Sequence, residues 1–172
     1  MVKKTPEVIN AVVDSKEETT EANELKAFAT GEVITLAEVN DGVFSAGIMG
    51  DGFAIIPEND VIYAPANGAI SVMMQDSRHA CGIKLDNGTE ILLHVGLDTV
   101  AMNGDGFEYL VKEGEKVSVG TPLIKFSKEK IKAAGYVDTT VCVITEPVGW
   151  ENVKFVTGVH AVAKETTVAK AE

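Results

Sequence analysis

The segment HACGIKLDNGTEILLHVGLD, which covers residues 79–98, contains two apolar runs joined by Asn-Gly. Asn-Gly between such runs is the strongest short signal of a β-hairpin, because both turn positions favour a positive φ. If the loop has two residues, Asp86 pairs with Thr89, and the register that follows pairs Cys81 with His94. The segment therefore predicts two antiparallel strands with a defined alignment.

The same register places His79 opposite Gly96. Because side chains alternate along a strand, His79 and His94 are expected on one face as diagonal neighbours, about 7–8 Å apart at the backbone. Gly96 would leave space beside His79, and Asp98 continues the alternation at the end of the strand. The third histidine, His160, is expected to be an ordinary strand residue. Two histidines on one face mark the candidate functional site.

The rest of the chain repeats the pattern of short strands and turns. Runs rich in Val, Ile and Leu are separated by Gly, Asn and Asp, which is typical of an antiparallel β-sandwich or barrel. Two segments, KAFATGEVITL (residues 26–36) and YAPANGAISVM (residues 63–73), resemble each other and indicate a duplicated unit. The best helix candidate is short, with Ser127 as N-cap and Gly135 as C-cap. We therefore predict an all-β fold with little helix.

The length of 172 residues suits one domain, which we expect to cover residues 24–166. Residues 1–23 are polar and predict a flexible arm, in which Thr5 and Pro6 are suited to begin a short helix. Residues 167–172 are expected to form a C-terminal tail.

The composition excludes several classes of protein. No apolar run reaches the roughly 20 residues that span a bilayer, and the start of the sequence lacks the long apolar core of a signal peptide. We therefore expect a cytoplasmic protein whose two cysteines, Cys81 and Cys142, are reduced thiols. The net charge of −11 argues against nucleic-acid binding and favours partners with a basic face.

Five blocks of the sequence resemble one known family. They are GDGFAI (50–55), YAPANGAI (63–70), SRHACGI (77–83), ILLHVGLDTVAMNGDGF (91–107) and VKEGEKVSVGTPLIKF (111–126). In order and spacing they are similar to the glucose-type enzyme IIA of the bacterial phosphoenolpyruvate-dependent sugar phosphotransferase system. The resemblance extends from residue 24 to residue 166, and it implies an antiparallel β-sandwich built on a duplicated hybrid motif.

The resemblance also implies a function and a set of site residues. In this family a histidine accepts a phosphoryl group from the phosphocarrier protein HPr and passes it to the IIB component of a sugar permease. Matched by motif, His94 is the acceptor through its tele nitrogen, Nε2, and His79 stabilises the phosphoryl group. Ser77 is then expected to orient His79 through a hydrogen bond, and the Gly96 carbonyl to fix the tautomer of His94. No cofactor is required, and no metal.

Two carboxylates, Asp51 and Asp98, are implied to meet arginines of HPr. Our hypothesis is that they leave the site electrostatically unbalanced until a basic partner docks, which would favour transfer to protein over transfer to water. The alternative is that one or both only stabilise turns. The segment before His79, MMQDSR, departs from the family pattern, since Ser77 stands where Thr is common.

Three other functions compete with the carrier. A zinc-dependent hydrolase of related fold would need His-x-His with further ligands, and the sequence contains no His-x-His. His79 and His94 could still bind zinc together with a carboxylate from a partner. A lipoyl or biotin carrier would need a hairpin lysine motif that this sequence lacks. The remaining alternative is a regulatory module that binds proteins through the same histidine face.

Overall fold

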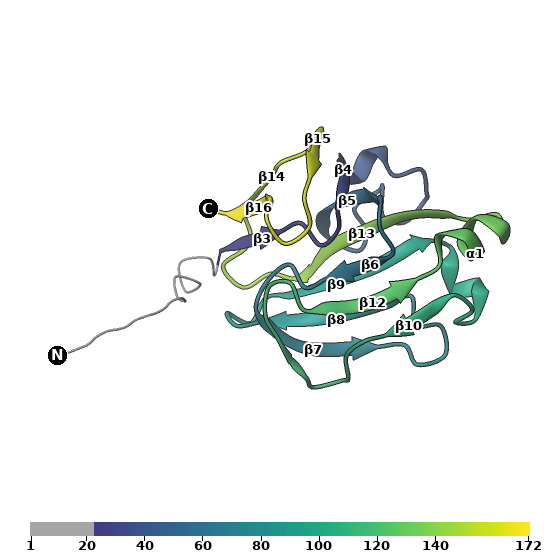
Figure 1. The fold of residues 1–172 in the computed structure, drawn as a ribbon. Helices are drawn as coiled ribbons and strands as arrows, with labels where there is room; N and C mark the ends of the chain where they lie inside the picture. Colours follow the sequence, from purple (N-terminus) through teal and green to yellow (C-terminus); the bar gives the residue numbers. More distant parts are fainter. Residues whose placement is uncertain (1–22) are drawn as a thin grey trace.

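A computed structural model describes residues 23–172 of the chain (Figure 1). Of the predicted arm, residues 1–22, including the helix expected near Thr5, lie outside the described residues. Within the described range the chain forms one large and two small antiparallel sheets, a single short α-helix and two 3-10 helices. The prediction of an all-β fold with little helix is confirmed.

The large sheet has eight strands in the order β11-β7-β8-β9-β13-β5-β4-β15. Their bounds are β11 (Lys116–Val117), β7 (Gly68–Met73), β8 (Ala80–Leu85), β9 (Glu90–Leu97), β13 (Val137–Glu146), β5 (Asp51–Pro57), β4 (Gly31–Thr35) and β15 (Val159–Ala161). The small sheets are β10 (Phe107–Tyr109), β12 (Pro122–Phe126) and β6 (Val61–Tyr63), and β14 (Val153–Phe155), β16 (Thr167–Ala171) and β3 (Glu24–Lys26). The helices are η2 (Leu36–Glu38), η3 (Thr99–Met102) and α1 (Lys128–Ala133).

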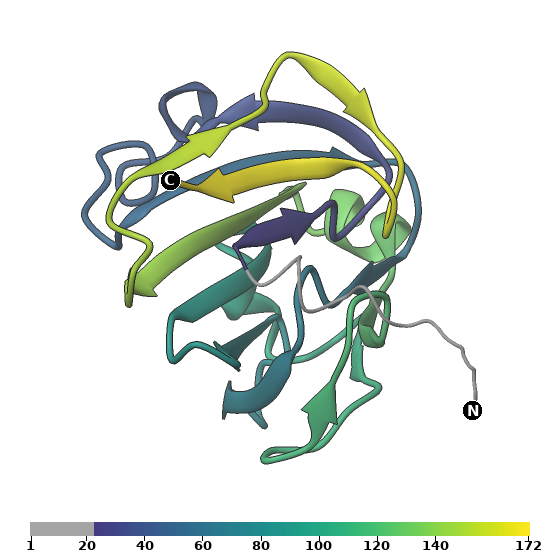
Figure 2. The same cartoon turned by 90° about the vertical axis from the view of Figure 1, so that its left-hand side faces the viewer.

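The main core lies between one face of the large sheet and the two small sheets (Figure 2). From the large sheet, β9 contributes Ile91 and Leu93 to it, while Leu123 of β12 and Val168 of β16 come from the two small sheets. These side chains are fully or almost fully buried. Strand alternation then sends the residues between them, such as Leu92, to the opposite face of the large sheet.

A second, smaller cluster covers that opposite face. It contains Ala54, Val141 and Val143 from the sheet, together with Leu36, Val39 and Phe44 from the segment that follows β4. His94 belongs to this face because it alternates with Leu93 and pairs with Val141. The segment that follows β4 thus packs beside the candidate site.

The duplicated unit predicted from the sequence is visible in the hydrogen bonds. When the two similar segments are aligned, Lys26 corresponds to Tyr63 and Phe28 to Pro65. The N–H of Lys26 donates to the oxygen of Pro65 at 2.9 Å, and the N–H of Tyr63 donates to the oxygen of Phe28 at 2.8 Å. Equivalent atoms therefore bind each other reciprocally, as two copies related by a two-fold axis must.

The partner strands repeat the same relation. Ala161 of β15 pairs with Gly31 of β4, and Val117 of β11 pairs with Gly68 of β7. The aligned positions Gly31 and Gly68 thus receive equivalent partners. The fold is built from two copies of one strand arrangement.

The predicted hairpin is present, but its register is shifted by one residue. Ala80, not Cys81, pairs with His94. The loop holds residues 86–88, since the N–H of Leu85 donates to the oxygen of Thr89 at 2.7 Å. Asn87 Oδ1 also accepts the N–H of Thr89 at 2.9 Å, a side-chain bond that stabilises the longer loop. The expected two-residue turn was therefore wrong.

The C-terminal residues are not a tail. Residues Thr167–Ala171 form β16, which pairs with both β3 and β14. Val168 and Ala169 are fully buried, while Lys170 points outward. The lysine and threonines made the segment look polar, although its apolar residues complete the core.

The α-helix begins where predicted. Ser127 is the N-cap, and its Oγ accepts the N–H of Lys130 at 3.1 Å. Ala134 is the C-cap, so that Gly135, with a φ of +88°, follows the cap by one residue. Among the helices that the structure describes, none is long and apolar enough to cross a membrane.

Candidate functional site

The rings of His79 and His94 meet with their centroids 4.5 Å apart, at an interplanar angle of 87°. The predicted convergence is therefore confirmed, although the expected register is not its cause. In the observed register the N–H of Val95 donates to the oxygen of His79 at 2.8 Å, so alternation alone would turn His79 away. His79 precedes β8 and follows Arg78, whose positive φ of 52° redirects the chain.

His94 is held by a hydrogen bond to its own strand. Its Nδ1 lies 2.8 Å from the oxygen of Gly96. A carbonyl oxygen only accepts, so Nδ1 carries the proton and the neutral ring keeps a lone pair on Nε2. Half-buried His94 thus presents one defined nitrogen for reaction.

Gly96 is required for its backbone rather than for space beside His79. Its φ is +80°, which side-chain-bearing residues rarely adopt, and a Cβ there would lie 2.4 Å from Cγ2 of Thr99. The prediction that Gly96 faces His79 was wrong, because Val95 takes that place in the ladder. The backbone turn at Gly96 is what brings its carbonyl under His94.

The surroundings of His94 include two residues that the sequence did not reveal. The ring of Phe44 lies 5.0 Å from the His94 ring in an edge-to-face arrangement. Burial lowers the pKa of His94, and this is opposed by the hydrogen bond to Gly96 and by the charges of Asp41 and Asp98. Phe44 and Asp41 lie in an irregular segment without strand or helix periodicity, so no pattern assigned them to the site.

His79 is more deeply buried than His94. It is 2% exposed, and burial, followed by the adjacent His94, lowers its pKa to about 4. Its Nδ1 has no hydrogen-bond partner among the described residues. Ser77 is also buried, yet no hydrogen bond joins it to His79 anywhere in residues 23–172. The expected orienting role of Ser77 is therefore not supported.

The two predicted carboxylates lie in different places. Asp98 follows β9 directly in a left-handed conformation, and its charge raises the pKa of His94. Asp51 begins β5, where it pairs with Ile144 and so lies level with Ile91 rather than with His94. It lines a separate hollow with Phe155 and others, and alternation along β5 turns it to the far face of the sheet. The placement of Asp51 at the site was wrong.

The other candidates lie apart from the histidine pair. No group of three or more metal-ligating side chains occurs in the described part of the chain. Cys81 and Cys142 are free and buried in the core, and burial raises the pKa of Cys81 to about 12. His160 is an exposed residue of β15 whose Nε2 lies 3.0 Å from Glu58.

The arrangement is suited to carrying a group on nitrogen. A neutral imidazole with a chosen lone pair is a nucleophile, and transfer of a phosphoryl group asks mainly for positioning and for stabilisation of oxygen charge. His79 stands within reach to supply a donor beside His94. No described side chain at the pair provides a hydrolytic metal centre.

Comparison with known proteins identifies the chain. Residues 23–148 match a model of the family described as phosphoenolpyruvate-dependent sugar phosphotransferase system, EIIA 1. A glucose-specific EIIA component of Bacillus cereus is 45% identical over 141 residues, which cover 82% of this chain and 85% of that protein. A glucose permease IIA from Mycoplasma capricolum has a solved structure that matches with a TM-score of 0.76 at 34% identity, covering 85% of this chain and 93% of that one.

Longer relatives contain the same unit. The β-glucoside-specific EIIBCA component of Bacillus subtilis is 50% identical over 115 residues, which are 67% of this chain and 19% of that protein. The glucose-specific EIICBA component of Streptococcus pneumoniae is 41% identical over 150 residues, 87% of this chain and 20% of that protein. The chain belongs to the EIIA 1 family of the phosphoenolpyruvate-dependent sugar phosphotransferase system, and it is a phosphocarrier of that system.

Proposed function

We propose that His94 takes a phosphoryl group from HPr on Nε2 and passes it to a cysteine of a IIB component, in the cytoplasm. The observation that carries this proposal is the hydrogen bond of 2.8 Å between His94 Nδ1 and the Gly96 oxygen. It leaves the Nε2 lone pair free to attack phosphorus. A phosphorus–nitrogen bond forms as the bond from phosphorus to the donor atom of HPr breaks, and that atom keeps the electron pair. No proton has to leave Nε2.

His79 supports the phosphoryl group in this proposal. Its ring is nearly perpendicular to that of His94, and its pKa of about 4 keeps it neutral near pH 7. A neutral imidazole donates from one nitrogen, and Nε2–H of His79 is the donor that we assign to a phosphoryl oxygen. Because this hydrogen bond exists only when the phosphoryl group is on His94, His79 acts chiefly on the transfer of that group to IIB.

Asp41 and Asp98 form the acidic rim of the site. Both raise the pKa of His94, so both act on it electrostatically. Exposed apolar side chains accompany them on the same segments: Val43, Ile48 and Met49 follow Asp41, and Val100 follows Asp98. Apolar surface with a rim of one charge is suited to a protein partner of opposite charge. We assign this surface to basic faces of HPr and IIB.

Intact-mass spectrometry tests the proposal. The protein is incubated with enzyme I, HPr and phosphoenolpyruvate, in parallel with His94→Ala, and then with a IIB component. One acid-labile phosphoryl group is expected on the wild-type protein and none on folded His94→Ala, with loss of the group when IIB is added. No phosphoryl group on the wild-type protein, or an unchanged amount on His94→Ala, would overturn it.

A further inference from the structure

Segment 74–80, which leads from the end of β7 into the first residue of β8, carries His79, and two side chains outside the histidine pair hold it. Since Nδ1 of His79 has no partner in the part of the chain described, the ring has no hydrogen bond there that sets its position. Its position depends on the backbone that bears it. One end of that backbone is fixed by the bond of 2.8 Å from the N–H of Val95 to the oxygen of His79.

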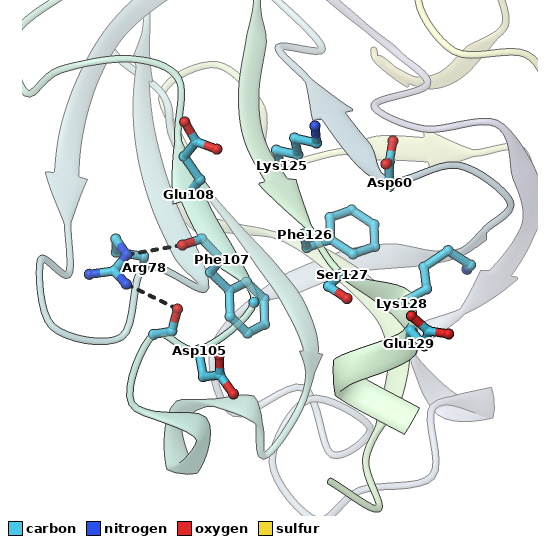
Figure 3. Close-up of a pocket in the computed structure, with 12 residues that line it drawn as sticks. Asp60, Arg78, Asp105, Phe107, Glu108, Lys125, Phe126, Ser127, Lys128 and Glu129 are labelled. Atoms are coloured by element: carbon cyan, nitrogen blue, oxygen red, sulfur yellow. Dashed lines mark hydrogen bonds between the residues drawn. The ribbon is translucent and has the colours of Figure 1, made fainter. Parts of the chain in front are cut away.

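Arg78 fixes the other side of the segment. Its Nε donates to the oxygen of Phe107 and its Nη2 to the oxygen of Gly104, both at 3.0 Å (Figure 3). Its Nη1 donates to the oxygen of Gln75 at 3.2 Å. All three guanidinium nitrogens thus bind backbone carbonyls, which ties segment 74–80 to the turn at residues 104–107. Arginine suits this contact because its donors lie in one rigid fork.

The two turns fit closely. A Cβ at Gly104 would lie 2.7 Å from Nη2 of Arg78 and 2.5 Å from the oxygen of Asp76. Arg78 itself has a φ of 52°, a conformation that is uncommon for residues with a side chain and persists when neighbouring contacts impose it. The guanidinium bonds supply such contacts directly next to His79.

Tyr109 connects the two ends of the same segment. Its hydroxyl accepts the N–H of Met74 at 2.8 Å and donates to the oxygen of Ala80. Met74 follows β7 and Ala80 begins β8, so one phenol bridges the residues on either side of the His79 turn. The bridge and the guanidinium bonds use different atoms of the segment and act together.

Arg78 also lines a cleft of about 620 Å³. Its charged lining includes both signs, and Figure 3 shows them spread around the cleft. Lys128 is already paired with Asp138, and Arg78 is bound to carbonyls, so neither is free to bind an anion. The bonds of Arg78 therefore connect the segment that carries His79 to the turn at residues 104–107.

We propose that Arg78 and Tyr109 are positioning residues that hold segment 74–80 and thereby place the His79 ring against His94. The proposal rests on the proposed function in one respect: the consequence of misplacement is slower phosphoryl transfer. A displacement of about 1 Å in a catalytic group lowers rates by up to roughly a hundredfold. Neither residue belongs to the acidic rim and apolar surface that we assign to HPr, so we expect docking of HPr to be unaffected.

The test uses Arg78→Lys, which keeps the charge but loses the fork, and Tyr109→Phe, which removes only the hydroxyl. Their matched controls are Lys125→Ala in the wall of the cleft and Tyr136→Phe. Neither control side chain makes a hydrogen bond to another of residues 23–172. The rate constant for phosphoryl transfer from His94 to a IIB component and the KM for HPr are measured, together with the ring NMR signals of His79 and amide exchange of Met74 and Arg78.

Both test variants are expected to remain folded and to transfer the phosphoryl group to IIB about tenfold to a hundredfold more slowly, with KM for HPr within about twofold of wild type. The His79 ring signals shift and the two amides exchange faster, while both controls match wild type. Transfer at the wild-type rate in both test variants overturns the proposal. Equal slowing of transfer in the control variants overturns it as well. If wild-type protein accepts no phosphoryl group, the proposed function fails, while unchanged ring signals and amide exchange in the variants would separately refute the positioning role.

Discussion

The two imidazoles of the site lie 4.5 Å apart and are held in different ways. His94 stands in the middle of the sheet, with its Nδ1 bound to Gly96 and its ring against Phe44. His79 stands outside a strand, with a buried Nδ1 that has no partner among residues 23–172. One ring is fixed by its own contacts, and the other by the chain around it.

This difference matches the two tasks that we assign. A nucleophile must present one nitrogen at all times, so a permanent hydrogen bond to its other nitrogen is useful. A group that stabilises the transferred phosphoryl needs its bond only during transfer, and preorganisation then comes from the surrounding backbone. The predictions below test whether the two rings can be separated in this way.

The largest effect is expected from removing each ring. His94→Ala should accept no phosphoryl group, whereas His79→Ala should still accept one but pass it to IIB about 10²–10³-fold more slowly, as for loss of a single stabilising donor. Quench-flow measurement of both half-reactions separates these outcomes. Equal loss in both half-reactions of His79→Ala would contradict the division of tasks.

The next effect is on stability as a function of pH. The pKa of His79 is about 4 in the folded protein, against 6.5 as its ordinary value, so between these values the unfolded chain binds the extra proton. Stability should therefore fall as the pH drops from about 6.5 to 4, by roughly 3 kcal/mol in total. Burial also lowers the pKa of His94, which adds in the same direction.

Urea unfolding across this pH range measures the effect. His79→Gln replaces the ring by a side chain that does not titrate, so its unfolding free energy should depend less on pH than that of the wild type. An identical pH dependence in the variant would show that the buried ring is not the source.

A smaller effect concerns the backbone under His94. Gly96→Ala places a side chain at a φ of +80° and drives its Cβ toward Thr99, so we expect a loss of about 2 kcal/mol or more and slower phosphorylation. Gly114→Ala is the matched control, since Gly114 has a φ of +85° but no atom within 4 Å of the added Cβ. Thermal unfolding and phosphorylation rates compare the two. Equal losses of stability would assign the whole effect to φ.

The smallest effect is expected at the acidic rim. Asp41→Asn and Asp98→Asn each remove a charge that raises the pKa of His94, so that pKa should fall further in both. KM for HPr should rise about two- to fivefold, since an exposed charge pair contributes up to ~1 kcal/mol. Asp51→Asn is the control, and NMR titration and steady-state kinetics provide the measurements. An effect of Asp51→Asn as large as the other two would contradict the placement of the rim.

Much of this molecule follows from local patterns in the sequence. Alternation in β9 predicts that Leu93 and His94 face opposite sides, and Asn87 with Gly88 predicts the turn before it. The hairpin loop nevertheless has three residues, because the side chain of Asn87 bonds the backbone of Thr89. The histidines still meet, since the turn at Arg78 compensates for the shifted register.

Contacts between distant segments could not be predicted in this way. Phe44 and Asp41 reach His94 from an irregular segment, and nothing in their spacing encodes that approach. The last strand, β16, looked polar because burial of Val168 and Ala169 depends on pairing with β3, at the other end of the described chain. The resemblance to a family pointed to the two histidines whose rings meet in the structure, but it misplaced Asp51, whose face is decided by its strand.

The most direct test of the account is the identity of the phosphorylated nitrogen. The protein is labelled with ¹⁵N, phosphorylated through HPr, and examined by long-range proton–nitrogen NMR of the histidine rings. The hydrogen bond from Nδ1 of His94 to Gly96 predicts a phosphoryl group on Nε2 of His94 alone. A phosphoryl group on Nδ1 of His94, or on His79, would contradict the account.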